Sequence, residues 1–178
     1  GKVYYDADEQ LMQAGGVQIY DAKVCYADGE MRDVTFHKAV TEDSSTGEVN
    51  GLAGAMLDVT ERKQLEAQLK QAAERDPLTG AFNRRKFFEL AGEAEARVRS
   101  SGVPLSVFVI DVDYFKRIND RFGHACGDAV LCNLVAVLED VLPQSHVLAR
   151  AGGEEFFCLL EGCDLVAAHR AAEYVRET

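Results

Sequence analysis

The chain has 178 residues, and its 30 acidic side chains outnumber its 19 Lys and Arg side chains, which gives a formal charge of −11. This charge argues against passive binding to nucleic acids or anionic membranes, because both require a basic surface. Hydrophobic residues make up 47% of the chain, enough for packed cores, but no apolar run reaches the length of about 18 residues that a membrane span needs, and no secretory leader is visible. We therefore expect a globular, cytoplasmic protein of one or two small domains.

The first third of the chain is predicted to form a three-stranded antiparallel meander. A strand over residues 17–26 precedes Asp28 and Gly29, a pair that predicts a two-residue hairpin turn with positive φ at both positions. The next strand alternates apolar and polar side chains, which is typical of a half-buried strand. Its apolar face holds Val34, Phe36 and Val40, and its polar face holds Asp33, Thr35 and His37. A third strand over residues 51–59 completes a sheet that needs a covering layer.

An amphipathic helix is predicted over residues 61–75. Thr60 is placed to cap its first turn, and Leu65 and Leu69 recur at helical spacing between charged residues. The helix is expected to end before Pro77, because the residue preceding a proline disfavours the α conformation. Its two heptads suit a short parallel dimer seam, but the same pattern also suits an ordinary linker helix.

A strand that ends in a carboxylate is the first chemical signal in the C-terminal part. After a predicted helix over residues 83–100, residues 105–110 form a nearly continuous apolar run, which predicts a strand buried on both faces. Asp111 ends this run. A carboxylate there needs a cation or hydrogen-bond donors, because burial penalises its charge.

A hairpin with two glycines in its turn is the second signal. Strands are predicted over residues 146–150 and 156–160, and the turn between them ends in Glu154 and Glu155. Pairing of this hairpin with the earlier strand would bring Glu154 close to Asp111. Facing carboxylates repel unless a divalent cation lies between them, and oxygen ligands without His or Cys favour Mg²⁺ or Mn²⁺. The pattern indicates metal-assisted phosphoryl or nucleotidyl transfer.

Five cysteines occur without a C-x-x-C pair, and most of them lie within apolar runs. Their odd number and spacing predict reduced thiols in the core, with a metal or redox site as the alternative.

Residues 5–63 resemble the C-terminal half of a PAS sensor domain. The motifs that carry the resemblance are ADG at 27–29, GLAG at 51–54 and DVTERK at 58–63. The last motif is similar to the exit of PAS domains into a signalling helix, so the resemblance implies a partial sensor over residues 1–60 and a linker helix over 61–75. The elements that line a PAS pocket are missing, and His37 suits a polar strand face better than a haem ligand, so no cofactor is expected there.

Residues 76–178 resemble the GGDEF domain of diguanylate cyclases. Four motifs occur in the family's order, which chance does not explain. They are DPLTG at 76–80 with Asn83 and Arg84, DVDYFK at 111–116 with Asn119 and Asp120, FGH at 122–124 with Gly127 and Asp128, and RAGGEEF at 150–156. The resemblance implies an α/β (α+β) fold of the ferredoxin or polymerase-palm type with an antiparallel hairpin.

The resemblance also implies a metal and base site. Two Mg²⁺ or Mn²⁺ ions per active site would be held by the side chains of Asp111 and Glu154 and by the main-chain carbonyl of Val112. Glu154 would also assist deprotonation of the attacking hydroxyl. Asn119 and Asp128 would read guanine, since a carboxylate accepts from the N1–H and 2-amino donors that adenine lacks.

The triphosphate would be held by backbone N–H groups near Phe115 and Lys116, and the Lys116 ammonium would offset charge that develops there. Gly152 and Gly153 would let the α-phosphate approach the hairpin. The other polar residues of the motifs are given mainly supporting roles. Asp113 is expected to be structural, Glu155 to support the hairpin, and Asp120 to lie on a helix surface or cap a helix. Arg150 is expected to tie the hairpin to the Asp76 turn, and His124 either to orient Asn119 or to touch the substrate.

The implied reaction condenses two GTP molecules into cyclic di-GMP and releases two pyrophosphates. Each subunit would hold one GTP, so activity requires a homodimer formed through the linker helix and the cyclase face, which a sensor can regulate. A non-catalytic GTP- or partner-binding dimeric module is the alternative, and its expected mark would be a lost metal ligand or a degenerate GGEEF motif. Use of ATP would require changes at Asn119 or Asp128.

Two features depart from the family pattern. Residues 143–146 read PQSH where many cyclases carry the R-x-x-D of a product-inhibition site, so no feedback inhibition through this site is expected. The family domain also continues beyond the position of Thr178 with a strand and a helix that bears Lys and Arg for the phosphates. We therefore expect a fragment of a longer sensor–cyclase, with weak GTP binding and little turnover alone, whose parent protein could be attached to a membrane.

Overall fold

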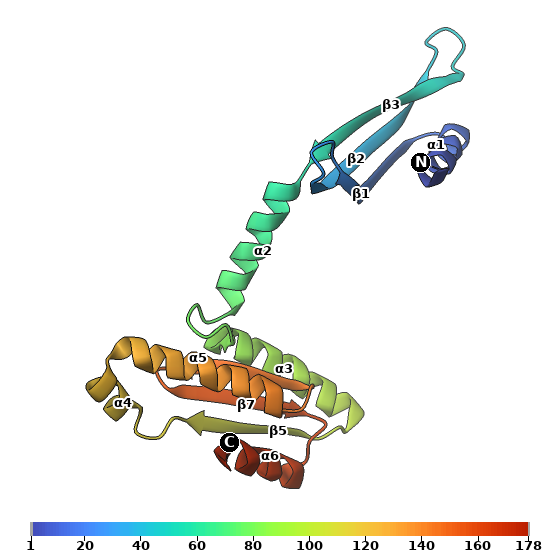
Figure 1. Cartoon of the computed structure of the whole chain (residues 1–178). Helices are drawn as coiled ribbons and strands as arrows, with labels where there is room; N and C mark the ends of the chain where they lie inside the picture. Colours follow the sequence, from blue (N-terminus) through green and yellow to red (C-terminus); the bar gives the residue numbers. More distant parts are fainter. Residues whose placement is uncertain (1, 178) are drawn as a thin grey trace. The chain divides into compact units, whose positions relative to one another are not determined.

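The computed structural model describes residues 2–177, with side chains from residue 8 onward. It divides into two compact units, Gly1–Leu69 and Lys70–Thr178, and the division falls within helix α2 (Thr60–Glu74). Figure 1 shows the elements of each unit. Within residues 2–177, no helix combines the length and the apolar character that crossing a membrane requires.

The first unit contains the predicted antiparallel meander. Strands β1 (Val17–Cys25), β2 (Met31–Glu42) and β3 (Val49–Asp58) pair in the order β1-β2-β3. The covering layer is helix α1 (Lys2–Ala14), which contacts β2 and β3 and was not predicted from the sequence. Its Leu11 is buried, and its Asp8 forms an ion pair with Lys38 of β2.

The turn between β1 and β2 differs from the prediction. Gly29 has a φ of 83°, but Asp28 is not among the residues with positive φ, so the predicted two-residue turn is wrong. The strands stop pairing at Cys25 and Met31, and the intervening loop is closed by hydrogen bonds from Tyr26 N to Glu30 O and from Gly29 N to Tyr26 O, both 2.9 Å. The longer loop needs the left-handed conformation only at its glycine.

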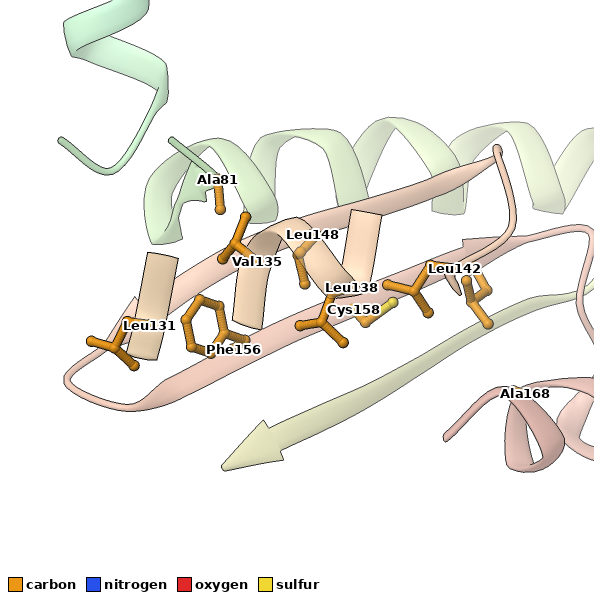
Figure 2. Close-up of a cluster of buried hydrophobic side chains, with 10 residues drawn as sticks. Ala81, Leu131, Val135, Leu138, Leu142, Leu148, Phe156, Cys158 and Ala168 are labelled. Carbon is orange, nitrogen blue, oxygen red and sulfur yellow. The ribbon is translucent and has the colours of Figure 1, made fainter. Parts of the chain in front are cut away.

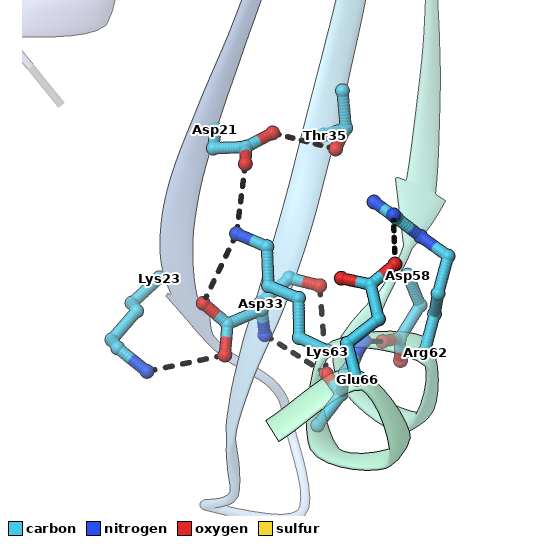
Figure 3. A network of polar contacts seen from close by, with 9 residues as sticks. Asp21, Lys23, Asp33, Thr35, Asp58, Arg62, Lys63 and Glu66 are labelled. Atoms are coloured by element: carbon cyan, nitrogen blue, oxygen red, sulfur yellow. Dashed lines mark hydrogen bonds and ion pairs between the residues drawn. The ribbon is translucent and has the colours of Figure 1, made fainter. Parts of the chain in front are cut away.

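The start of α2 is tied to the sheet by polar contacts (Figure 3). The predicted capping role of Thr60 is wrong, because its hydroxyl accepts a hydrogen bond from Asp33 N (2.9 Å), while Asp58 Oδ1 accepts from Thr60 N (3.0 Å). Lys63 Nζ donates to Asp21 Oδ2 at 2.7 Å. This bond, followed by one from a strand hydroxyl, holds the pKa of Asp21 below its usual value. The first turn of α2 is therefore joined to both β1 and β2.

The second unit is a mixed four-stranded sheet with helices on both faces, which confirms the predicted α/β class. Its strands pair in the order β4-β6-β7-β5, with β4 parallel to β6 and the other pairs antiparallel. The strands are β4 (Phe82–Asn83), β5 (Leu105–Asp111), β6 (His146–Gly152) and β7 (Glu155–Glu161). The helices are α3 (Arg84–Ser101), α4 (Phe115–Phe122), α5 (His124–Val141) and α6 (Leu165–Glu177).

Strand β7 supplies the centre of two cores. Its alternate side chains Phe156, Cys158 and Leu160 pack with α5 and α6. Figure 2 shows Phe156 and Cys158 beside the side chains of α5. Leu159, which points to the other face, packs with Phe87 of α3. The period of two along β7 therefore fixes which helix lies on which face of the sheet.

Two predictions about burial are only partly right. Phe108 and Ile110 of β5 pack against the core, but Val107 and Val109 are 53% and 59% exposed, so burial on both faces is wrong. Val107 lies opposite Leu159 on the face that α3 covers, but α3 packs mainly on β6, and β5 lies two strands away from β6. The cysteines are free thiols as predicted, but among the described residues only Cys158 is buried.

Candidate functional site

The carboxylates predicted to bind metal lie where β5 ends and β7 begins. The antiparallel register places Asp111 directly opposite Glu155, and Glu154 is the preceding residue, in the turn. Directly opposed residues on antiparallel strands have Cβ atoms about 5 Å apart, and like charges there are destabilising. Among the described residues, none of these three carboxylates forms a side-chain hydrogen bond or ion pair. The hairpin prediction is confirmed, and the register concentrates negative charge at this end of the sheet.

The turn that carries Glu154 is held by Arg150, as predicted. Arg150 Nη1 lies 3.1 Å from Asp76 Oδ1, and Arg150 Nε and Nη2 donate to Gly153 O at 2.9 and 2.7 Å. Gly152 and Gly153 have φ angles of 149° and 56°, which favour glycine at both positions. Because Arg150 contacts both the turn and Asp76, the position of the turn is fixed from two sides.

Asp76 is itself held by several donors. Its Oδ1 accepts from the amide and the hydroxyl of Thr79 at 2.9 and 2.8 Å, in addition to Arg150. Burial would raise the pKa of this carboxyl, but these hydrogen bonds outweigh burial and hold the pKa below its usual 3.8. Asp76 is therefore an ionised anchor at neutral pH.

The segment between β5 and α4 presents backbone groups beside Asp111. Tyr114 adopts a left-handed conformation with φ 57°, the single non-glycine residue with positive φ in the described chain. Phe115 N donates to Val112 O at 3.3 Å, and the amides of Arg117 and Ile118 both donate to Tyr114 O. Between them, the amide of Lys116 has no backbone acceptor within the described segment, so of the two predicted phosphate-binding amides only this one is free.

Asn119 and Asp128, predicted to read guanine, come from α4 and from α5, which pack against each other. The Oδ1 atom of Asn119 is buried and has no hydrogen-bond partner among the residues that the structure describes. A buried polar atom without a partner is costly, so this oxygen is a candidate ligand contact. His124 forms no hydrogen bond with this oxygen, and its orienting role stays a prediction. Asp128 and His124 are exposed.

The outer face of α4 was missed by the sequence analysis. Tyr114 and Phe122 are 73% and 60% exposed, and the guanidinium groups of Arg117 and Arg121 lie 5.2 and 5.0 Å from their ring centres. These residues border a hollow of about 520 Å³. The i, i+3 spacing of Tyr114 and Arg117 was the available signal, but it does not distinguish a site from an ordinary helix surface.

No group of three or more His, Cys, Asp or Glu side chains suitable for a metal ion occurs in the described part of the chain. The predicted donor set contains only two carboxylates, with a main-chain carbonyl as the third ligand, so it is not such a group. The Val112 carbonyl accepts one hydrogen bond but has two lone pairs, so it retains the capacity to bind a cation. The donors present therefore fit a hard divalent ion.

Comparison with known families identifies one match that covers more than half of the chain. The family model described as "Diguanylate cyclase, GGDEF domain" matches residues 73–178. A diguanylate cyclase of Vibrio cholerae serotype O1 is 37% identical over 172 residues, which cover 96% of this chain and 54% of that protein. The chain thus spans about half the length of this relative.

Solved structures show the same similarity. The diguanylate cyclase SiaD of Pseudomonas aeruginosa, crystallised with its activator SiaC, matches 66% of this chain and 45% of its own with 38% identity and a TM-score of 0.58. The coiled coil and GGDEF domain of DgcB from Caulobacter crescentus, in complex with c-di-GMP, matches 66% of this chain and 61% of its own with 27% identity and a TM-score of 0.61.

Proposed function

Because the chain belongs to the diguanylate cyclase GGDEF family, we propose that its residues 73–178 take part in condensing two GTP molecules into cyclic di-GMP and two pyrophosphates. The observation that carries the proposal is the register of β5 and β7, which sets Asp111 opposite Glu155 and beside Glu154 without a neutralising cation in the described chain. This arrangement suits a reaction that handles polyphosphate with divalent ions.

We assign the metal site to Asp111, Glu154 and the Val112 carbonyl, with Mg²⁺ or Mn²⁺ as the ions and two per active site. A bound divalent ion lowers the pKa of the attacking 3′-hydroxyl and neutralises charge on the leaving pyrophosphate. Glu154 accepts the proton of that hydroxyl. Its turn is fixed by Arg150, so the backbone that carries the carboxylate is held in place before substrate binds.

We assign guanine recognition to Asn119 and Asp128. The unpartnered Oδ1 of Asn119 supports this, because the 2-amino group of guanine is a donor that would satisfy it. The exposed carboxylate of Asp128 accepts from N1–H. Adenine lacks both donors, so binding ATP would leave these acceptors unpaired, and the site would reject it.

We assign phosphate binding to the start of α4 and to the turn that contains Gly152 and Gly153. The free amide of Lys116 and its ammonium group offer two donors, and Gly152 and Gly153 leave open space where a side chain would otherwise project. His124, exposed at the first position of α5, is assigned a contact with the substrate.

Residues 1–60 are proposed to be the C-terminal part of a PAS sensor, and α2 the signalling helix that joins it to the cyclase domain over 76–178. The antiparallel meander and the polar contacts between β1, β2 and the first turn of α2 support this. Helix α2 has no buried residue, and Leu65 and Leu69 are 52% and 70% exposed, which supports a homodimer seam. We also propose a cytoplasmic location for this domain, because GTP is its proposed substrate.

The test is mass spectrometry of the products after the full-length protein that contains this chain is incubated with GTP and Mg²⁺. Wild type should form cyclic di-GMP, and Glu154→Gln should abolish it because the proton acceptor and metal ligand is lost. Glu42→Gln is the matched control, since Glu42 is exposed and without a partner among the described residues, and it should keep full activity.

Failure of the folded, dimeric protein to form product would refute the proposal. GTP binding without turnover would then favour the non-catalytic signalling module.

A further inference from the structure

Gly127 lies in the contact between α4 and α5, next to two residues assigned to the site. It is buried, and a Cβ atom at this position would lie 2.0 Å from Asn119 Oδ1, 2.9 Å from Asn119 Cγ and 3.2 Å from Phe115 Cζ. Real Cβ atoms essentially never come within 3.0 Å of another heavy atom, so the two contacts with Asn119 could not form without a shift. The space that Asn119 occupies is therefore available only because residue 127 has no side chain.

The atom that a side chain at 127 would strike first is also the one without a partner. Asn119 Oδ1 is the end of a flexible side chain, so it can move by rotating about its own bonds, whereas the helices are held by the core. An added methyl group would thus displace the Asn119 amide and leave α4 and α5 in place.

We propose that Gly127 is a positioning residue that sets the Asn119 amide and, through it, the preference for guanine over purines that lack a 2-amino group. The inference rests on the proposed function, because it concerns the substrate of the same site. Gly127 also precedes Asp128 directly, so the close approach of the helices at Gly127 fixes the spacing between the two side chains that read the base.

The chain offers a matched control for the substitution. Gly92 lies in the middle of α3, where a Cβ would meet no atom within 4 Å, and neither Gly92 nor Gly127 has a positive φ. Alanine is a better helix former than glycine, so the backbone tolerates both Gly127→Ala and Gly92→Ala. Any loss confined to Gly127→Ala therefore comes from the neighbours of the new methyl group.

The experiment measures binding of GTP and of inosine triphosphate, which lacks the 2-amino group, by titration calorimetry in the presence of Mg²⁺. For Gly127→Ala we expect about tenfold weaker GTP binding and less than about twofold change for inosine triphosphate, because only GTP donates to the displaced oxygen. Gly92→Ala should bind both as wild type does. In an Asn119→Ala background, Gly127→Ala should add less than about twofold, since no amide remains to be displaced.

Failure of the positioning role of Gly127 and failure of the proposed function give different results. Wild type that fails to bind GTP would overturn both. Wild-type binding with unchanged affinity in Gly127→Ala, or with equal losses for the two nucleotides, would overturn the inference alone. If Gly127→Ala unfolds while the double variant with Asn119→Ala folds, the helices yield before the amide does, and the positioning role is refuted.

Discussion

Replacing Arg150 with Met removes the contact that fixes the turn between β6 and β7, and it keeps most of the apolar stem of the side chain. The change deletes two hydrogen bonds to Gly153 O and the ion pair with Asp76. The Arg150 and Asp76 side chains are only 15% and 19% exposed, so water replaces these contacts poorly. We expect the second unit to lose much of its stability.

The magnitude follows from the geometry. At the observed 3.1 Å and an effective dielectric constant of about 20, the gross attraction between the two charges is about 5 kcal/mol. Desolvation of both groups offsets a large part of it. A hydrogen bond to a charged group contributes about 1.5–3 kcal/mol net, so we expect Arg150→Met to lower the free energy of unfolding by about 2–3 kcal/mol.

Hydrogen exchange of the β6 and β7 amides is the assay, because it reports on the second unit separately from the first. The slowest amides should exchange about 30- to 150-fold faster, which corresponds to the expected loss. The matched control is Arg97→Met, which deletes another two-pronged Arg contact, to Glu161, with side chains 54% and 32% exposed. An exposed pair contributes about 1 kcal/mol or less. Equal effects of the two substitutions would refute the reasoning.

Asp76→Asn should make the free energy of unfolding depend less on pH in acid. The pKa of Asp76 is held below 3.8, so the stabilisation by its carboxylate is present in full above pH 3.8 and is lost as pH falls through the lowered pKa. Burial raises the pKa of the Cys158 thiol to about 12, so at about pH 8 iodoacetamide should label exposed Cys25 and spare Cys158, as peptide mass spectrometry would show. Lys63→Gln should speed hydrogen exchange of the α2 amides from residue 63 onward, because the contact with β1 is lost; unchanged exchange would count against that contact. Leu69→Lys should convert the proposed dimer to monomer in sedimentation velocity, and a persisting dimer would exclude the α2 seam.

Elements whose signals are local were predictable from the sequence. Helix α3 starts where Asn83 Oδ1 accepts from Lys86 N and ends at Gly102, whose φ is 71°, so each boundary is set by the chemistry of a few adjacent residues. The meander was predictable because its alternation has a period of two, and the hairpin of β6 and β7 because glycines separate two apolar runs.

Features that depend on distant partners were not predictable. The Thr60 hydroxyl contacts an amide of β2 instead of its own helix, and nothing near Thr60 indicates this. The exposure of Val107 depends on where β5 lies in the sheet. In the site, the residue types were recognisable, but the register that opposes Asp111 to Glu155 and the contact of Asn119 with Gly127 arise only from strand and helix packing.

Strand β5 determines where the sheet of the second unit can grow. It ends the strand order, so one side of its backbone has no strand partner among the described residues. Residues 105–110 read LSVFVI, with no charge, proline or glycine, and Val107 and Val109 face outward. Natural edge strands usually carry charged residues or proline, which block pairing with further strands, and β5 has neither between residues 105 and 110. The unpaired side of β5 is therefore where a further strand, from this protein or from a second copy, can join the sheet.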